Sequence, residues 1–296
     1  MTALNKKAIK LIFRLGTGSF GESGFNTIEV TGKRVRASIT KAGGASMGQA
    51  QIRVYGLTPS VMNELTALTT QTMMLRENSV TVLAGDDGAT GMPVIFAGTI
   101  SEGWADLNDA PDASLYVSAF AGLVEAVKPA NPTSYPGKAD AVAILANMAG
   151  RMGLFFENSG VTPVMVSTPY FAGSLREQAM SCARAISDSV EVLIDDGTLA
   201  IWPKGGSRGA QVALVSPDTG MVGYPAYNGT GISVTTRFNP AIGFGQAVRV
   251  ESSIKTATGE WFVHGLQHEI DSESPGGEWF THFQGAPLYN TNVITK

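Results

Sequence analysis

The sequence is poor in the residues that build disulfides and metal sites. It has one cysteine and three histidines in 296 residues, so an internal disulfide and a cysteine-based zinc site are both excluded. Cys182 lies in the helical pattern REQAMSCARAI, where a small buried apolar side chain is expected rather than a nucleophile.

Charge and long apolar runs are also scarce. Charged residues make up 16% of the chain and the net charge is −4, which gives no basic surface for sequence-independent binding of DNA. No apolar stretch reaches the roughly 18 residues of a membrane-spanning helix, so we predict no membrane insertion. Lys10 and Arg14 interrupt the apolar residues near the N-terminus. We therefore expect synthesis in the cytoplasm without a signal peptide.

Glycine is abundant, with 35 residues beside 14 prolines, which favours a β-rich fold with many turns. Alternating apolar residues predict these strands in the first part of the chain: Ala8–Leu15, Thr27–Ala42, Gln49–Tyr55, Val80–Ala84, Val94–Ala105 and Ser114–Ala121. One helix is predicted among them at residues 58–68, where Thr58 supplies the N-cap and Pro59 the first turn.

The pattern changes after a proline-rich linker at residues 128–137. A helix is predicted over Asp140–Met152, closed by Gly153. A second helix begins with the capping box of Ser174 and Glu177. Asp196-Gly197 between two apolar runs then predicts a hairpin with a type I′ turn.

The end of the chain repeats part of its beginning. Val35–Val54 (VRASITKAGGASMGQAQIRV) is similar to Ile232–Val250 (ISVTTRFNPAIGFGQAVRV). In both copies a strand with a central glycine follows, Gly98 in the first and Gly265 in the second. Two similar β units in one chain indicate a protein in which symmetry matters more than chemistry.

The predicted fold class is therefore mainly β with an α+β insertion. Two similar barrel-like β domains flank a middle domain that contains helices. The predicted parts are a first β domain at residues 1–127, the linker at 128–137, the middle domain at 138–220 and the second β domain at 221–296.

Two glycine-rich motifs could be interpreted as cofactor-binding loops, but the residues around them do not support this interpretation. Gly16–Gly21 (GTGSFG) follows a strand, but a strand rather than a helix comes next, so the chain lacks the helix N-terminus that binds a pyrophosphate. Lys204–Gly209 (KGGSRG) lacks the spacing of a phosphate-binding loop and is better explained as a turn.

The histidines do not predict a metal site. His264 and His268 lie four residues apart in a strand pattern, which separates them by about 13 Å. His282 lies in the strand that can pair with theirs. We predict no catalytic, cofactor-binding or metal-ligating residue, and no enzyme activity.

One alternative of another class stays open. The chain has carboxylates in turns and four tryptophans, and both residue types occur in cell-wall hydrolases and glycan-binding β proteins. The relevant residues are Asp86, Asp87, Asp106, Asp109, Asp112, Asp195, Asp196, Trp104, Trp202, Trp261 and Trp279. Turn formation accounts for most of these carboxylates equally well.

Several stretches resemble the baseplate hub proteins of contractile-tailed bacteriophages. They are Thr31–Leu68, Ala143–Leu154, Val166–Gly206 and Val248–Ser272. The middle part is also similar to late control D proteins and to the base of secretion-system spikes.

The resemblance implies a structural protein of the virion tail baseplate. Such hubs are homotrimers in which two tube-like domains per chain form a ring of six similar units. The ring is a symmetry adaptor between a hexameric tail tube and a trimeric spike. The implied partners are a second and third copy of the chain, a tail tube or tube-initiator protein, a spike protein and a tape-measure protein. DNA would pass only transiently through a central channel.

The matching places of the two motif copies would lie near subunit interfaces of this ring. The residues concerned are Gly48, Gln49, Arg53, Gly245, Gln246 and Arg249. After Gly285 only a short tail follows, Ala286–Lys296, whereas larger hubs extend towards the spike. A tail-tip adaptor of a non-contractile phage, or of a related injection device, is the alternative within the same class.

Overall fold

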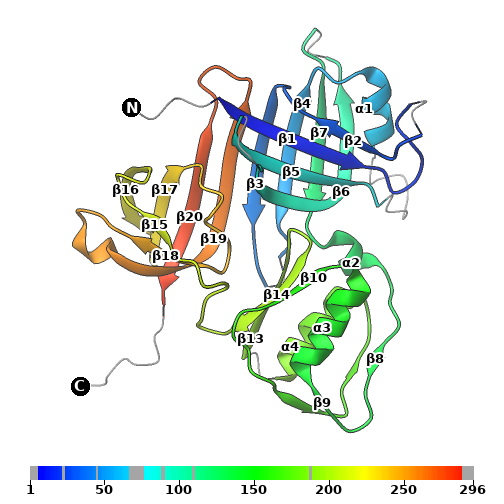
Figure 1. The fold of residues 1–296 in the computed structure, drawn as a ribbon, viewed down its shortest axis with the longest axis vertical. Coiled ribbons are helices and arrows are strands. Elements are labelled where there is room, and N and C mark those ends of the chain that lie inside the picture. The colour runs from blue at the N-terminus through cyan, green and yellow to red at the C-terminus, as the bar shows by residue number, and fades with distance from the viewer. Residues whose placement is uncertain are drawn as a thin grey trace. The chain divides into compact units, whose positions relative to one another are not determined.

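A computed structural model describes residues 6–21, 24–44, 46–66, 77–87, 91–108, 111–186 and 189–288 (Figure 1). The chain forms two compact units. Unit 1 comprises Met1–Thr40, Gly48–Ala121 and Gln267–Thr281, and unit 2 comprises the remaining segments, Lys41–Met47, Gly122–Leu266 and His282–Lys296.

The sheet of unit 1 is antiparallel, and alternate side chains of its strands are buried. In β3 the buried residues are Val35, Ala37 and Ile39, with Arg36 and Thr40 on the exposed face. This period of two is the pattern from which the strands were predicted. The strands are β1 (Lys7–Arg14), β2 (Thr27–Val30), β3 (Val35–Lys41), β4 (Gln49–Tyr55), β5 (Ser79–Asp86), β6 (Val94–Asp106) and β7 (Ser114–Phe120). Their order is β3-β4-β7-β6-β5-β1-β2.

Two predictions for this unit need correction. The predicted strand Thr27–Ala42 is divided into β2 and β3, because Gly32 adopts a positive φ of 62° in the turn between them. Helix α1 (Pro59–Leu65) begins at the predicted cap, Thr58, but ends before residue 68. Thr66 is extended, with φ −67° and ψ 119°, and residues 67 and 68 lie outside the described residues.

The helical part of unit 2 follows its sequence signals closely. The Asp140 side chain accepts hydrogen bonds from the Val142 and Ala143 amides and begins α3 (Ala141–Met152), which Gly153 ends at φ 72°. Both hydrogen bonds of the predicted capping box are present at Ser174, which begins α4 (Leu175–Ala185). The other short elements are α2 (Leu123–Val127), β8 (Thr133–Ser134), β9 (Lys138–Asp140), β11 (Met165–Ser167) and β12 (Tyr170–Phe171).

A small sheet packs against these helices. It has the order β10-β14-β13 and consists of β10 (Phe155–Asn158), β13 (Val190–Asp195) and β14 (Thr198–Pro203). Asp196 and Gly197 have φ of 48° and 76°, so the predicted type I′ turn is confirmed. Leu145 and Met148 from α3, with Cys182 from α4, share one buried core with Val192 and Ile201 of the sheet. In Figure 1, α3 and α4 run side by side.

Unit 2 also contains further, mainly antiparallel strands of a 13-stranded sheet, here called the second sheet. They have a core of their own, which includes Val234, Val248, Val263 and Phe283. Its strands are β15 (Ala213–Val215), β16 (Met221–Tyr227), β17 (Ile232–Arg237), β18 (Ala247–Val250), β19 (Gly259–Ser272) and β20 (Trp279–Pro287). Their order is β16-β17-β20-β19-β18, and β15 pairs in parallel with β18. A 3₁₀ turn, Lys255–Ala257, precedes β19. The far end of the β19–β20 hairpin, Gln267–Thr281, belongs to unit 1.

The two β sheets have the same strand order. The order β3-β4-β7-β6-β5 in the first corresponds, strand for strand, to β16-β17-β20-β19-β18 in the second. The predicted fold class, two similar β domains with a helical insertion, is therefore confirmed. The division into three domains at the predicted boundaries stays a prediction.

The strand order also gives a correspondence that the short sequence repeat did not. The repeat matched β4 with β18, whereas the strand order matches β4 with β17 and β5 with β18. The environments agree with this difference: Ala50 lies opposite Ala119 of β7, and Ala247 lies opposite Phe262 of β19. Glycine-rich matches over a few residues cannot fix which strand pairs with which, because pairing depends on the whole sheet.

Candidate assembly surface

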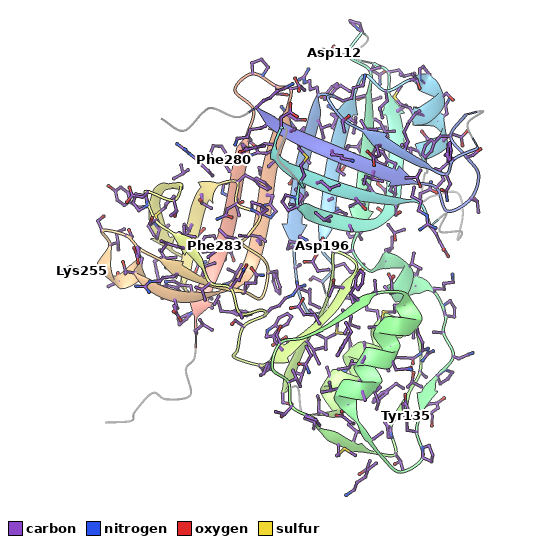
Figure 2. The ribbon with its side chains drawn as sticks, in the orientation of Figure 1. Asp112, Tyr135, Asp196, Lys255, Phe280 and Phe283 are labelled. Atoms are coloured by element: carbon purple, nitrogen blue, oxygen red, sulfur yellow. The ribbon has the colours of Figure 1, made fainter. Side chains whose placement is uncertain are left out.

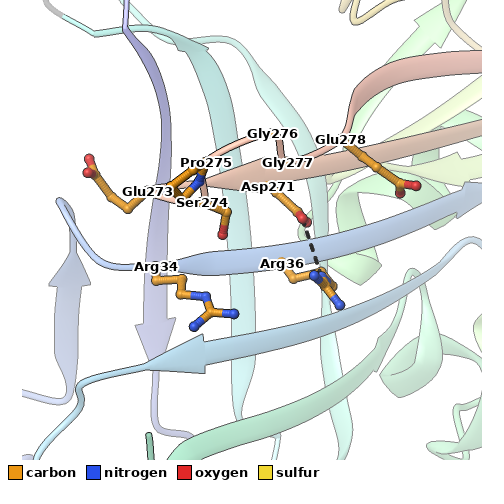
Figure 3. Close-up of a pocket in the computed structure, with 9 residues that line it drawn as sticks. All are labelled: Arg34, Arg36, Asp271, Glu273, Ser274, Pro275, Gly276, Gly277 and Glu278. Atoms are coloured by element: carbon orange, nitrogen blue, oxygen red, sulfur yellow. Dashed lines mark hydrogen bonds and ion pairs between the residues drawn. The ribbon is translucent and has the colours of Figure 1, made fainter.

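The tip of the β19–β20 hairpin packs along β3 through paired polar side chains. Residues two apart in a strand share a face, so Arg36 and Ser38 of β3 lie together. Ser38 Oγ donates a hydrogen bond of 2.7 Å to Glu269 Oε1, and Arg36 Nε donates one of 3.3 Å to Asp271 Oδ2. The dashed line in Figure 3 marks the second of these. These contacts, together with β3–β19 strand pairing, hold the hairpin on unit 1.

A cavity of about 550 Å³ lies beside this contact, between Arg34, Arg36 and the turn of the hairpin (Figure 3). The Arg34 guanidinium stacks 4.4 Å from the centre of the Tyr55 ring. Glu273 forms an ion pair with Lys6. The Lys6 side chain donates a hydrogen bond to this carboxylate, which raises the pKa of Lys6. Cations and carboxylates line the cavity together, so it has no net preference for a phosphate or a metal ion.

Strand β16 is the outermost strand of the second sheet, and β17 is its neighbour there. Its side chains Val222, Tyr224 and Tyr227 are exposed, the two tyrosines by 70% and 80%. Gly223 has a positive φ of 69° and the pairing register shifts between Val222 and Ala226. Pro225 has no N–H to donate. An edge strand of this kind, aromatic and without charged side chains, is a surface on which another chain can pack.

A buried ionic cluster lies in the middle part of unit 2. Lys41 Nζ is 2.7 Å from Asp195 Oδ1 and 2.5 Å from Asp196 Oδ2; Asp196 is labelled in Figure 2. Arg208 hydrogen-bonds to both carboxylate oxygens of Glu157, at 2.9–3.1 Å. Burial by itself disfavours the charged lysine, but the attraction of the two aspartates outweighs it and raises the pKa of Lys41. Arg208 belongs to the loop predicted as a turn, and its charge is used inside the fold.

The six residues predicted at subunit interfaces make local contacts within their own units. The Gly48 carbonyl accepts a hydrogen bond from the Ala121 amide. Gln49 Nε2 donates to Ser118 Oγ at 3.4 Å, and Arg53 forms an ion pair with Asp106 at 3.1 Å. All three contacts join β4, or the residue before it, to the neighbouring part of unit 1.

The second set behaves in the same way. Gly245 adopts φ 83°, and a Cβ there would lie 2.9 Å from the Trp202 ring. Gln246 Oε1 accepts a hydrogen bond from the Gly243 amide, and Arg249 forms an ion pair with Glu251 at 3.2 Å. The interface role of these six residues stays a prediction.

Cys182 and two of the three histidines, which were considered for catalysis or metal binding, make contacts within the fold. Cys182 is fully buried, and burial raises the pKa of its thiol to about 12, so the prediction of a small buried apolar residue is confirmed. His268 Nδ1 lies 2.9 Å from Thr281 Oγ1, and His282 Nδ1 lies 2.9 Å from Thr235 Oγ1. Within the described residues, no group of three or more His, Cys, Asp or Glu side chains is placed to hold a metal ion.

The remaining geometry concerns loops and helices. The loop Gly16–Gly21 follows β1, and β2 begins at Thr27. Among the helices that the structure describes, none combines the length and the apolar character needed to cross a bilayer.

A family model for the baseplate hub gp41 matches residues 18–280. The chain belongs to the baseplate hub gp41 family. This confirms the predicted relationship to phage baseplate hubs and gives the chain a place in the virion tail. No curated protein sequence is significantly similar to it.

Solved structures of tail proteins share the hub's fold at very low sequence identity. The tail protein from Neisseria meningitidis MC58 is 11% identical, with a TM-score of 0.63 over 95% of this chain and 96% of that one. The tail protein of prophage MuSo2 from Shewanella oneidensis is 10% identical, with a TM-score of 0.56 over 94% and 97%. At these identities the likeness establishes the fold alone.

A secretion-system protein has the same fold. The E. coli c3393 protein is 9% identical, with a TM-score of 0.57 over 94% of this chain and 77% of that one. It is described as a component of the type VI secretion system that is structurally similar to the T4 tail proteins gp27 and gp5.

The sequence reasoning missed the exposed edge of the hub's second sheet. Whether Val222, Tyr224 and Tyr227 are exposed depends on the position of β16 in the sheet, which sequence periodicity does not give. One signal was present: a proline inside a strand, Pro225, indicates an edge.

Proposed function

We propose that three copies of this chain form the structural hub of a phage baseplate. The hub joins a six-fold tail tube to a three-fold spike. The repeated strand order carries the proposal, because β3-β4-β7-β6-β5 and β16-β17-β20-β19-β18 give each chain two sheets of one topology. Three chains then present six similar sheets to a six-fold tube while keeping three-fold symmetry towards a spike.

The hub acts by assembly and not by catalysis. Its partners are a tail tube or tube-initiator protein on one side, a spike protein on the other, and a tape-measure protein in a central channel. DNA is a transient passenger, since a chain of net charge −4 has no excess of cations to retain a phosphate backbone.

The six motif residues Gly48, Gln49, Arg53, Gly245, Gln246 and Arg249 remain proposed neighbours of subunit interfaces. The side chains of Gln49, Arg53, Gln246 and Arg249 already make contacts inside their own units, and glycine has no side chain, so we expect the six residues to shape these surfaces through the backbone. The proposal does not require these six residues to bind the neighbouring subunit through their side chains.

The mass of the purified protein tests the proposal. Three chains of 31.0 kDa give a particle of 93 kDa, and images of it should have a three-fold outline with six inner lobes. A chain that stays monomeric at its highest soluble concentration contradicts the proposal. Peptidoglycan turnover that a single carboxylate substitution abolishes would instead favour the hydrolase alternative. Co-purification with a sheath protein separates a contractile tail from a non-contractile one.

A further inference from the structure

Strand β19 pairs with different strands along its length. Its first residues, 259–262, pair with β18. Its last residues reach beyond β18 and lie on β3, through the Ser38–Glu269 and Arg36–Asp271 contacts. The chain thus already contains one contact in which the extended strand of one repeat covers the outer strand of the other.

Strand β6 is the counterpart of β19 in the strand order, and it has the same two parts. Its first residues pair with β5, from Val94 opposite Leu83 to Thr99 opposite Ser79. Residues 103–106 continue beyond β5 and pair with β7. Within the described residues, no strand pairs with this extension as β3 pairs with that of β19. Helix α1 packs on one face of it, where a Cβ on Gly103 would lie 2.6 Å from the Leu65 carbonyl oxygen.

Strand β16 is the counterpart of β3. The outer side of β3 is covered by β19, whereas the outer side of β16 has no neighbouring strand among the described residues. The repeat therefore leaves one extension, on β6, and one uncovered outer strand, β16. In the described part of one chain, the β6 extension and β16 are not neighbours in the sheet.

We propose that β16 of one copy packs on residues 103–106 of β6 in a second copy, and that this contact is the intermolecular counterpart of the β3–β19 contact. It rests on the proposed trimer, and it names the surfaces that hold that trimer together. The contact joins two different surfaces, head to tail, so identical copies can repeat it until the ring closes at three.

The chemistry of the two surfaces is complementary. The Trp104 and Tyr116 rings stack at 4.1 Å on the β6–β7 hairpin, and Leu107 is exposed beside them in the sequence. Tyr224 and Tyr227 supply exposed aromatic rings on β16. Aromatic side chains are enriched at the centres of protein interfaces, where their burial contributes most of the affinity. The β3–β19 contact within the chain is formed by polar side chains. The proposed β16–β6 contact between copies would have the same strand arrangement but would be formed by aromatic side chains.

Disulfide trapping tests the contact directly. Tyr224→Cys is combined with Ala105→Cys in one variant and with Asp106→Cys in another, to sample both side-chain registers. A disulfide requires Cα atoms about 5.5 Å apart, so it forms only where β16 and β6 are adjacent. The native Cys182 is buried and does not compete. We expect one pair to give a covalent species of three chains under oxidising conditions, and a reductant to dissolve it.

Tyr224→Cys with Val94→Cys is the matched control. Val94 is also exposed and lies on the same strand, but at its other end, against β5. Random collision would cross-link this control as readily as the test pairs. The proposal requires cross-linking of a test pair and none of the control.

A charge on β16 provides a second measurement. Tyr224→Lys should convert the trimer to monomer while leaving the circular dichroism spectrum of the fold unchanged, because Tyr224 is exposed and its replacement leaves the core intact. Tyr170→Lys is the matched control: Tyr170 is 65% exposed but lies on β12, and this variant should remain trimeric.

These measurements distinguish failure of the β16–β6 contact from failure of the proposed trimer. A wild-type trimer that neither test pair cross-links, and that Tyr224→Lys leaves intact, overturns this contact and leaves the hub function standing. A wild-type chain that never forms a trimer overturns the proposed function, and this contact with it.

Discussion

Replacing Lys41 by methionine should leave a buried carboxylate without its nearest cation. Lys41 is the last residue of β3, and its side chain is only 6% exposed. It lies 2.7 Å from Asp195 and 2.5 Å from Asp196. Methionine keeps most of the length of the side chain and removes its charge, so Asp195, also buried, loses its nearest cation.

The cost follows from the burial of Asp195. Removing one partner of a buried ion pair typically destabilises a protein by about 3–5 kcal/mol, because the remaining charge is left without compensation. Arg208 stays 3.7 Å from Asp195, which favours the lower end of this range. Asp196 is more exposed, so its lost pair adds little. We expect a loss of about 3 kcal/mol, which corresponds to a Tm lower by roughly 6–12 °C for a unit of this size.

Chemical and thermal denaturation of the wild type and two variants measures this loss in the free energy of unfolding. The single variant is compared with the wild type and with Lys41→Met combined with Asp195→Asn. In the double variant the uncompensated charge is gone, and Arg208 keeps Glu157 as its partner. Most of the lost stability should therefore return, because replacing both members of a buried pair is often nearly neutral.

The pH dependence has a definite sign. The pKa of Lys41 is raised above its ordinary 10.5, so its contribution is complete below pH 10.5 and is lost only as the pH rises through the higher folded-state value. The difference in stability between wild type and Lys41→Met should thus be constant from pH 6 to about pH 9. A loss under about 1 kcal/mol, or a double variant less stable than the single one, would refute the reasoning.

Further predictions concern single positions. Ser174→Ala removes the capping box of α4 and should cost about 1 kcal/mol, measured by urea denaturation. Gly98→Ala should cost about 1–3 kcal/mol, since a Cβ would lie 2.6 Å from Phe96 and 2.7 Å from the Phe120 carbonyl; its control, Gly150→Ala, meets nothing within 4 Å in α3 and should stabilise by about 1 kcal/mol. Cys182 should react with a thiol reagent only on unfolding, because the pKa of its thiol is about 12; rapid labelling of the native protein would contradict this. Burial raises the pKa of Glu157, but the hydrogen bonds and charge of Arg208 outweigh this and lower it below 4.5. Its contribution to stability is therefore present above pH 4.5 and should be lost as the pH falls further, and Glu157→Gln should remove that part of an acid titration.

Local signals fixed the local structure. Asp140, Gly153 and Ser174 satisfy the ends of α3 and α4 through hydrogen bonds to residues within a few positions, so the sequence alone predicted where these helices begin and where α3 ends. Asp196-Gly197 fixed its hairpin for the same reason, since positive φ at both positions is a property of the two residues themselves. The buried state of Cys182 followed from its place on the apolar side of a helix.

The sequence by itself thus determined the class of fold, the helix caps, the hairpin turn and the family, all of which depend on neighbouring residues or on patterns along the chain. Only the tertiary structure decided that β4 corresponds to β17, that β3 is covered by β19, and that β16 exposes Tyr224 and Tyr227. It also brought Lys41 to Asp195, more than 150 positions away. These features depend on which strands hydrogen-bond across long sequence separations, and that is decided by the packing of whole sheets, because any one strand can satisfy its backbone against many partners.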